Sequence, residues 1–212
     1  MDQKTLSNLI EYNQPEIYEY EYGKFTADFD IFCNKVTKGE ALDIACGTGR
    51  IAFKLTELGL NCTGIDGSEP MLIFAKEKAK NKRLEILFLN LDMKIFSLNK
   101  KFDLITMAGN SFQFLLNEAD QKQCLETIAS HMTDSGFFIL NLRNINSDEM
   151  RTTNEFEHWH DFNYKDNQIV KVFGKQCFDP KTNIVKYTTK RIGTNFEFIN
   201  DLKIKFTSYP DL

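Results

Sequence analysis

The stretch Ala41-Leu-Asp-Ile-Ala-Cys-Gly-Thr-Gly-Arg50 joins a short apolar run to an acidic residue and a Gly-x-Gly turn. Apolar positions then recur at helical spacing through Arg50-Ile-Ala-Phe-Lys-Leu-Thr-Glu-Leu58. This order predicts a strand, a tight turn and a helix whose first backbone N–H groups are exposed to a ligand. Asp43 lies near the end of the predicted strand, where open α/β sheets bind their ligands. An acid at that position suits a cationic ligand better than a pyrophosphate.

A second acidic residue, Asp66, follows the turn at the end of a second predicted strand. Asn61-Cys-Thr-Gly-Ile-Asp66 has the composition of a short strand, and it ends 17 residues after Gly49. In a βαβ nucleotide site, an acid in this position accepts hydrogen bonds from ribose hydroxyls. The alternative is structural: the glycine turn only packs the helix on the strand, and Asp66 caps a helix that starts at Glu69.

The rest of the chain predicts an α/β fold in two parts. Strands are expected at 40–45, 61–66, 84–90, 102–107 and 136–142, with helices at 49–58, 69–81 and 118–132. Alternation of this kind indicates a doubly wound, mostly parallel, Rossmann-like sheet. Residues 93–101 are too few for a full crossover helix, so a short helix or loop is expected there. Beyond Arg143, strands at 155–163, 168–178, 184–192 and 196–206 predict an antiparallel β meander. We expect one domain over residues 1–145, with an N-terminal helical lead-in, and a β elaboration, as a lid or dimer element, over 146–212.

Three segments resemble the class I S-adenosylmethionine-dependent methyltransferases of small-molecule type. Asp43-Ile-Ala-Cys-Gly-Thr-Gly49 resembles their first motif, Gly64-Ile-Asp-Gly-Ser-Glu-Pro-Met-Leu72 the second, and Asn90-Leu-Asp-Met93 the third. The lead-in Tyr18-Glu-Tyr-Glu-Tyr-Gly-Lys-Phe25 is also similar. The resemblance covers about residues 17–142, and Ala45 stands where many members have glycine.

The resemblance implies S-adenosyl-L-methionine as the cofactor. It places the methionine end on Asp43 and the turn, the ribose on Asp66, and the adenine on Asp92 and Met93. Asn110 would lie over the methionine end, near the acceptor. The implied cofactor-binding residues are Tyr22, Asp43, Ala45, Cys46, Gly47, Gly49, Asp66, Gly67, Asp92, Met93 and Asn110. Ser111 would lie beside Asn110 over the methionine end. Further candidates for lining the cavity are Tyr12, Tyr18 and Tyr20.

His158 and His160 are the candidate catalytic residues. The apolar alternation over 155–163 places both imidazoles on one face of a strand, where either could act as a general base. The alternative is that neither takes part in catalysis. A metal site is not expected, because the sequence offers no third ligand at a fixed spacing.

Composition limits the partners of the protein. The chain of 212 residues has a net charge of −4 with scattered basic residues, which argues against a nucleic-acid phosphate track. Five separated cysteines indicate a reduced, cytoplasmic protein. No signal peptide and no membrane span are expected. The expected partner is therefore a small-molecule acceptor, methylated on nitrogen or oxygen.

Two alternatives remain open on the sequence. Gly47-Thr-Gly-Arg-Ile-Ala52 also fits the loose pattern of an NAD-dependent oxidoreductase. Members of the resembled family normally continue beyond the β meander with a helix and a hairpin, so a cofactor-binding module without turnover is the other alternative. Strand 136–142 would then be an open edge, covered by strands from residues 155–206 or by a second copy in a homodimer.

Overall fold

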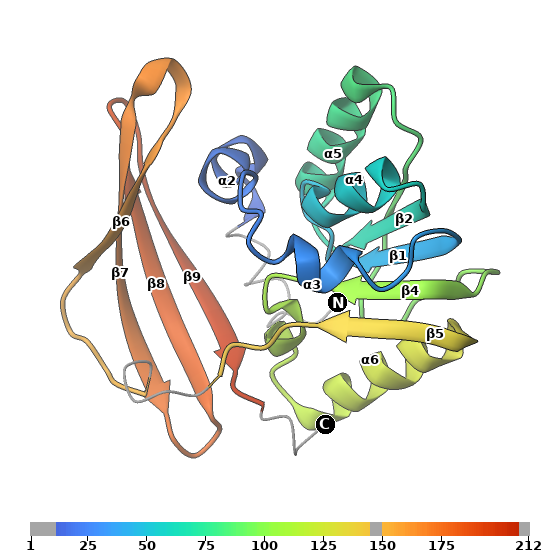
Figure 1. The fold of residues 1–212 in the computed structure, drawn as a ribbon. Helices are drawn as coiled ribbons and strands as arrows, with labels where there is room; N and C mark the ends of the chain where they lie inside the picture. Colours follow the sequence, from blue (N-terminus) through green and yellow to red (C-terminus); the bar gives the residue numbers. More distant parts are fainter. Residues whose placement is uncertain (1–11, 145–149, 208–212) are drawn as a thin grey trace.

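A computed structural model describes residues 12–144 and 150–207 of the chain (Figure 1). The parallel part contains α2 (Pro15–Tyr22), α3 (Phe29–Cys33), β1 (Glu40–Ile44), α4 (Arg50–Glu57), β2 (Asn61–Asp66), α5 (Glu69–Lys82), β3 (Leu87–Asn90), β4 (Phe102–Met107), η2 (Ser111–Phe114), α6 (Glu118–Ser130) and β5 (Met132–Leu140). The antiparallel part contains β6 (Glu157–Asn163), η3 (Lys165–Asn167), β7 (Ile169–Asp179), β8 (Ile184–Ile192) and β9 (Glu197–Lys205).

Five parallel strands form the first sheet in the order β3-β2-β1-β4-β5. Residues of α3, α4 and α5 share one apolar core on one face of this sheet, and α6 contributes to a second core on the other face. Strands covered on both faces are mostly apolar, as the buried Ala41, Leu42 and Ile44 of β1 illustrate. The predicted doubly wound, Rossmann-like fold is confirmed.

Local boundaries differ from the predictions where a turn or a bulge intervenes. Arg83 adopts a left-handed conformation that ends α5, so β3 begins at Leu87 rather than at residue 84. β5 begins at Met132 because its pairing with β4 shifts register between Phe102 and Leu104. Residues 93–101 cross over as a loop with one isolated bridge, as their number predicts.

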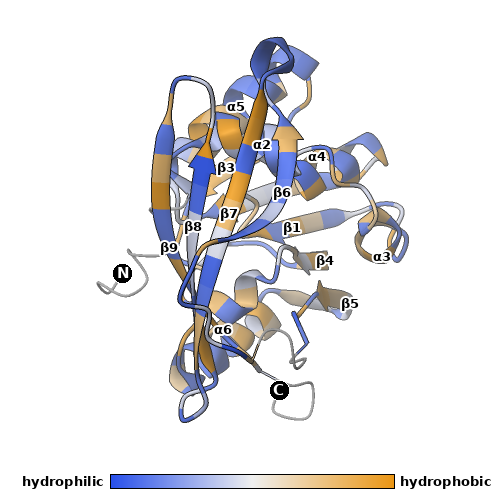
Figure 2. Ribbon diagram, turned by 90° about the vertical axis from the view of Figure 1, so that its left-hand side faces the viewer, coloured by the Kyte–Doolittle hydropathy of each residue, from blue (hydrophilic) through white to orange (hydrophobic). Residues whose placement is uncertain are grey.

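Strands β6 to β9 form a separate antiparallel sheet in sequential order. Figure 2 shows its outer side, where hydrophilic and hydrophobic residues alternate along the strands. Its inner side contributes Val185, Tyr187 and Ile204 to a small core. The predicted meander is confirmed, but the expectation that these strands cover β5 is wrong, because among the described residues β5 pairs only with β4. The homodimer stays a prediction.

Helix α2 lies between the two sheets (Figure 1). Pro15 opens it at a position where a missing backbone N–H costs nothing. None of the helices in the described ranges is long and apolar enough to span a membrane.

Candidate functional site

The turn between β1 and α4 is built from left-handed backbone. Ala45, Gly47 and Gly49 have φ of 54°, 56° and 85°, and the N–H of Gly49 donates to the carbonyl of Cys46 over 2.8 Å. An L-residue pays about 1–2 kcal/mol for this conformation, so Ala45 is the strained member of the three. A Cβ on Gly49 would lie 2.8 Å from the Phe53 ring. This position therefore needs glycine for space as well as for backbone freedom.

Asp43 is buried at the end of β1 and faces this turn. Its carboxylate accepts hydrogen bonds from the N–H of Ala52 (3.1 Å) and the hydroxyl of Thr106 (2.9 Å). Burial raises the pKa of Asp43 to about 7, although these two hydrogen bonds lower it. A buried carboxylate that titrates near neutrality becomes fully charged most easily when a cation lies next to it.

Asp66, at the end of the neighbouring strand β2, is bonded to the same turn. One carboxylate oxygen accepts from the N–H of Gly47 and the other from the N–H of Ser68, both at 2.8 Å. Burial raises the pKa of this carboxyl. Each carboxylate oxygen has a second lone pair, which leaves Asp66 able to accept hydrogen bonds from a ligand hydroxyl. The spacing between Gly49 and Asp66 thus brings the two motifs together.

These residues line the first of two adjoining cavities, which encloses about 110 Å³. Asp92 and Met93, just after β3, also line this cavity. The Thr48 hydroxyl is buried in its wall and finds no hydrogen-bond partner among the described residues. A polar ligand is expected to satisfy this hydroxyl, since an unpaired buried hydroxyl is costly. The cavity lining contains Asp43, Ala45, Cys46, Gly47, Asp66, Gly67, Asp92 and Met93 of the predicted set.

The second cavity encloses about 460 Å³ between α2, the ends of β4 and β5, and the inner side of the antiparallel sheet. Asn110 lines this cavity rather than the first one. Its side chain accepts from the amide of Asn141 over 2.7 Å, and the Asn141 side chain accepts from the Asn110 N–H over 3.2 Å. Asn110 therefore lies in the wall of the second cavity and outside the lining of the first.

The tyrosines of α2 divide between the two cavities. Tyr18 lines both, whereas Tyr22 lines only the second and is 39% exposed. Tyr20 points the other way, against the ring of Tyr164. Burial raises the pKa of Tyr18 to about 12, so its hydroxyl keeps its proton at neutral pH. The sequence emphasised Tyr22, but Tyr18 lies next to the turn. Tyr18 lies four residues before Tyr22 on a helix begun by Pro15, so the two side chains are neighbours on one helix face. This spacing could have indicated Tyr18 from the sequence.

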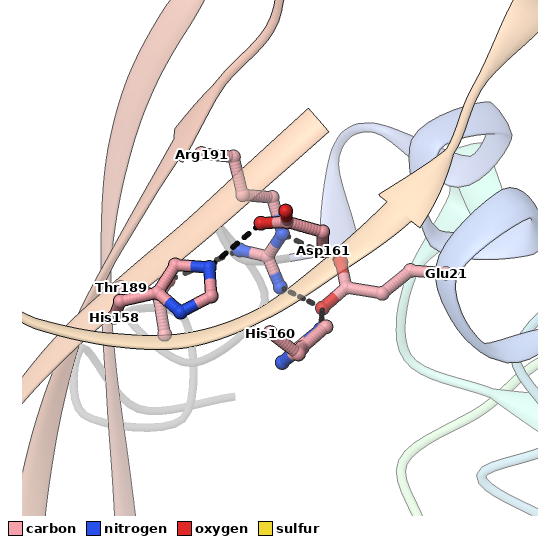
Figure 3. A network of polar contacts seen from close by, with 6 residues as sticks. All are labelled: Glu21, His158, His160, Asp161, Thr189 and Arg191. Atoms are coloured by element: carbon pink, nitrogen blue, oxygen red, sulfur yellow. Dashed lines mark hydrogen bonds and ion pairs between the residues drawn. The ribbon is translucent and has the colours of Figure 1, made fainter. Parts of the chain in front are cut away.

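The prediction that His158 and His160 share one face is wrong, because a β-bulge at Trp159 interrupts the alternation. His158 pairs with Phe173 and bonds Asp161 over 2.7 Å, while His160 pairs with Val172 and bonds Glu21 over 3.0 Å (Figure 3). Neither ring lines either cavity. Across residues 12–144 and 150–207, no three His, Cys, Asp or Glu side chains are arranged to hold a metal ion.

Comparisons with known proteins agree with this geometry. The family described as "Methyltransferase domain" matches residues 41–136. The chain is 33% identical over 105 residues to the glycine/sarcosine N-methyltransferase of Aphanothece halophytica, which is 49% of this chain and 40% of the relative. It is 32% identical over 117 residues to the glycine N-methyltransferase of Rattus norvegicus, with the same coverage. The matched stretch therefore spans about two fifths of these relatives.

A solved structure extends the likeness of the fold to most of the chain. An S-adenosylmethionine-dependent methyltransferase from Clostridium acetobutylicum ATCC 824 superposes with a TM-score of 0.71 at 22% identity, over 96% of this chain and 82% of that one. Both sheets thus belong to a known architecture. An oxidoreductase finds no support among these matches.

Proposed function

We propose that this chain, whose residues 41–136 belong to the class I S-adenosylmethionine-dependent methyltransferases, transfers a methyl group from S-adenosyl-L-methionine to a nitrogen or oxygen atom of a small molecule. The observation that carries the proposal is the convergence of Asp43, Asp66 and Asp92 on one cavity that adjoins a larger one. A methyl donor and an acceptor need two such neighbouring sites.

Several residues of the first cavity would share the binding of the donor. Asp43 would hold the cationic methionine end together with the turn from Cys46 to Gly49, and the Thr48 hydroxyl would gain the partner it lacks. Asp66 would accept from the ribose hydroxyls, and Asp92 and Met93 would frame the adenine. When bound, S-adenosyl-L-methionine supplies a methyl group already activated by its sulfonium. The residues of the chain then only orient the reactants and exclude water, and such positioning is worth roughly 7–11 kcal/mol of barrier.

The acceptor would occupy the second cavity. Its wall combines the rings of Tyr22, Trp159 and Tyr187 with the polar side chains of Asn110 and Asn141. Tyr18 stands where the two cavities meet, so its phenol would lie close to the transferred group. Two relatives are named as N-methyltransferases of glycine, which favours nitrogen as the attacking atom. A role of His158 or His160 as general base stays a prediction from the sequence.

Binding and turnover test this proposal separately. Calorimetry is expected to detect S-adenosylhomocysteine binding to the chain, with no comparable binding of NAD. Transfer of a tritiated methyl group to a panel of small amines and hydroxy compounds then tests turnover, with RNA as the negative control. Absence of S-adenosylhomocysteine binding would refute the proposal. Binding without transfer to any member of the panel would favour a cofactor-binding module without turnover.

A further inference from the structure

A buried ionic cluster borders the second cavity, whose lining includes Arg191 but not Glu21. Glu21, in the last turn of α2, has a side chain that is 1% exposed, and Arg191 of β8 is 6% exposed. The Nε of Arg191 donates to Glu21 over 2.7 Å and its Nη2 donates over 3.3 Å. This two-point contact fixes the relative orientation of the two side chains more strictly than a single hydrogen bond does.

His160 is the third member of the cluster. The bulge at Trp159 turns its ring inward, and its Nε2 lies 3.0 Å from the carboxylate of Glu21 (Figure 3). Burial raises the pKa of Glu21, but the hydrogen bonds from His160 and Arg191 outweigh this effect and lower it below its ordinary value. Glu21 is therefore ionised at neutral pH and stays paired with the sheet.

A cluster of this kind contributes little to net stability, because removing two charges from water costs about as much as their attraction returns. What it does supply is a defined geometry. Glu21 attaches α2 to the antiparallel sheet, and Glu19 pairs with Lys78 to attach the same helix to α5. Tyr18 and Tyr22, which flank these two glutamates in the sequence, line the cavities. The rotation of α2 about its axis, and hence the place of the Tyr18 phenol, depends on both contacts.

We propose that Glu21 and Arg191 are positioning residues for methyl transfer: their ion pair holds α2 so that Tyr18 closes the first cavity and borders the second. This inference rests on the proposed function. Glu21 itself is assigned no contact with donor or acceptor. The ion pair affects methyl transfer through the position of Tyr18.

The test compares Glu21→Gln with Glu16→Gln, a matched variant on the same helix. Glu16 pairs with Lys165, but its side chain is 46% exposed, so its loss should matter little. Hydrogen exchange of α2 amides, measured without ligand, reports the attachment of the helix. Calorimetry with S-adenosylhomocysteine reports closure of the first cavity. A double variant, Glu21→Arg with Arg191→Glu, reverses the pair and tests rescue.

Glu21→Gln leaves the Arg191 charge buried without its ionic partner, which is far more costly than the net worth of the intact pair. We therefore expect α2 exchange to accelerate roughly 100-fold and the affinity for S-adenosylhomocysteine to fall about 10-fold or more. Glu16→Gln should change each by less than about twofold. The charge-reversed pair should recover part of both losses. Faster exchange with unchanged affinity, or unchanged exchange, would overturn the positioning role while leaving the proposed function intact. Failure of the unmodified chain to bind S-adenosylhomocysteine would refute the proposed function, and the positioning role with it.

Discussion

The floor and the roof of the cavities are built in opposite ways. The floor is the carboxyl edge of the parallel sheet, where Asp43 and Asp66 end strands that pair directly with each other. The roof, defined as α2 with β6 to β9, is joined internally by the pair of Glu21 and Arg191 and is attached to the parallel part by side-chain contacts such as that of Glu19 with Lys78. The floor therefore depends on backbone geometry within a short stretch of the sequence. The roof depends on contacts between residues far apart in the sequence.

The largest effect expected on the floor comes from Gly49→Ala. Left-handed φ costs about 1–2 kcal/mol, and the added methyl group would lie 2.8 Å from Phe53 and 3.1 Å from Phe88, which adds about 1–3 kcal/mol of overpacking. Urea unfolding measures the sum. Gly59→Ala is the matched control, because Gly59 also has positive φ but nothing lies within 4 Å of its added Cβ. Equal losses in the two variants would show that space around the turn is not limiting.

Asp66→Ala should weaken the binding of S-adenosylhomocysteine by roughly 10- to 150-fold. The reason is the loss of hydrogen bonds to a charged group, worth about 1.5–3 kcal/mol. Calorimetry measures the change. Because Asp66 also accepts from Gly47 and Ser68, thermal unfolding must accompany it, and Asp66→Asn serves as the variant that keeps one acceptor. An unchanged affinity in Asp66→Ala would remove the ribose assignment.

Stability should fall as the pH rises from about 4 to 7, because of Asp43. The folded protein retains the proton of this carboxyl up to about pH 7, whereas the unfolded chain loses it near 3.8, so the folded state binds more protons in this window. Asp43→Asn should remove this slope and stabilise the protein by about 1–3 kcal/mol at pH 8. Urea unfolding at several pH values provides the measurement. If the free energy of unfolding of the wild type changed with pH in parallel with that of the variant, the buried state of Asp43 would be contradicted.

The two histidines offer the smallest and most selective test of the roof. His160→Ala should cost about 1–1.5 kcal/mol, because Glu21 loses a hydrogen bond. His158→Ala should cost less than about 0.5 kcal/mol, since its pair with Asp161 is exposed. Thermal unfolding of both variants measures these two losses of stability. Equal effects would mean that the bulge at Trp159 does not separate the two rings.

The sequence predicted the floor because its determinants are local. A strand, a turn and an acid at fixed spacing dictate where Asp43, Gly47 and Asp66 meet, and no distant contact is needed. The roof was predicted only as strands. A single bulged residue at Trp159 reversed the face of His158, and no periodicity reveals such an insertion. Which of Tyr18 and Tyr22 lines the first cavity likewise depends on the rotation of α2 about its axis. Glu21 sets that rotation through Arg191, which is 170 positions away in the sequence.

The span between Glu21 and Arg191 also bears on how the chain folds during synthesis. Contacts between distant residues form late, since a long loop must close before they yield any stabilisation. The parallel strands up to β5 can pair as they leave the ribosome, but α2 must wait for β8 before its carboxylate finds the guanidinium. The first helix described in the protein can rest on α5 earlier through Glu19 and Lys78, but it is expected to gain its second attachment only at that late stage. A nascent chain would carry a formed but open floor until β8 has been made.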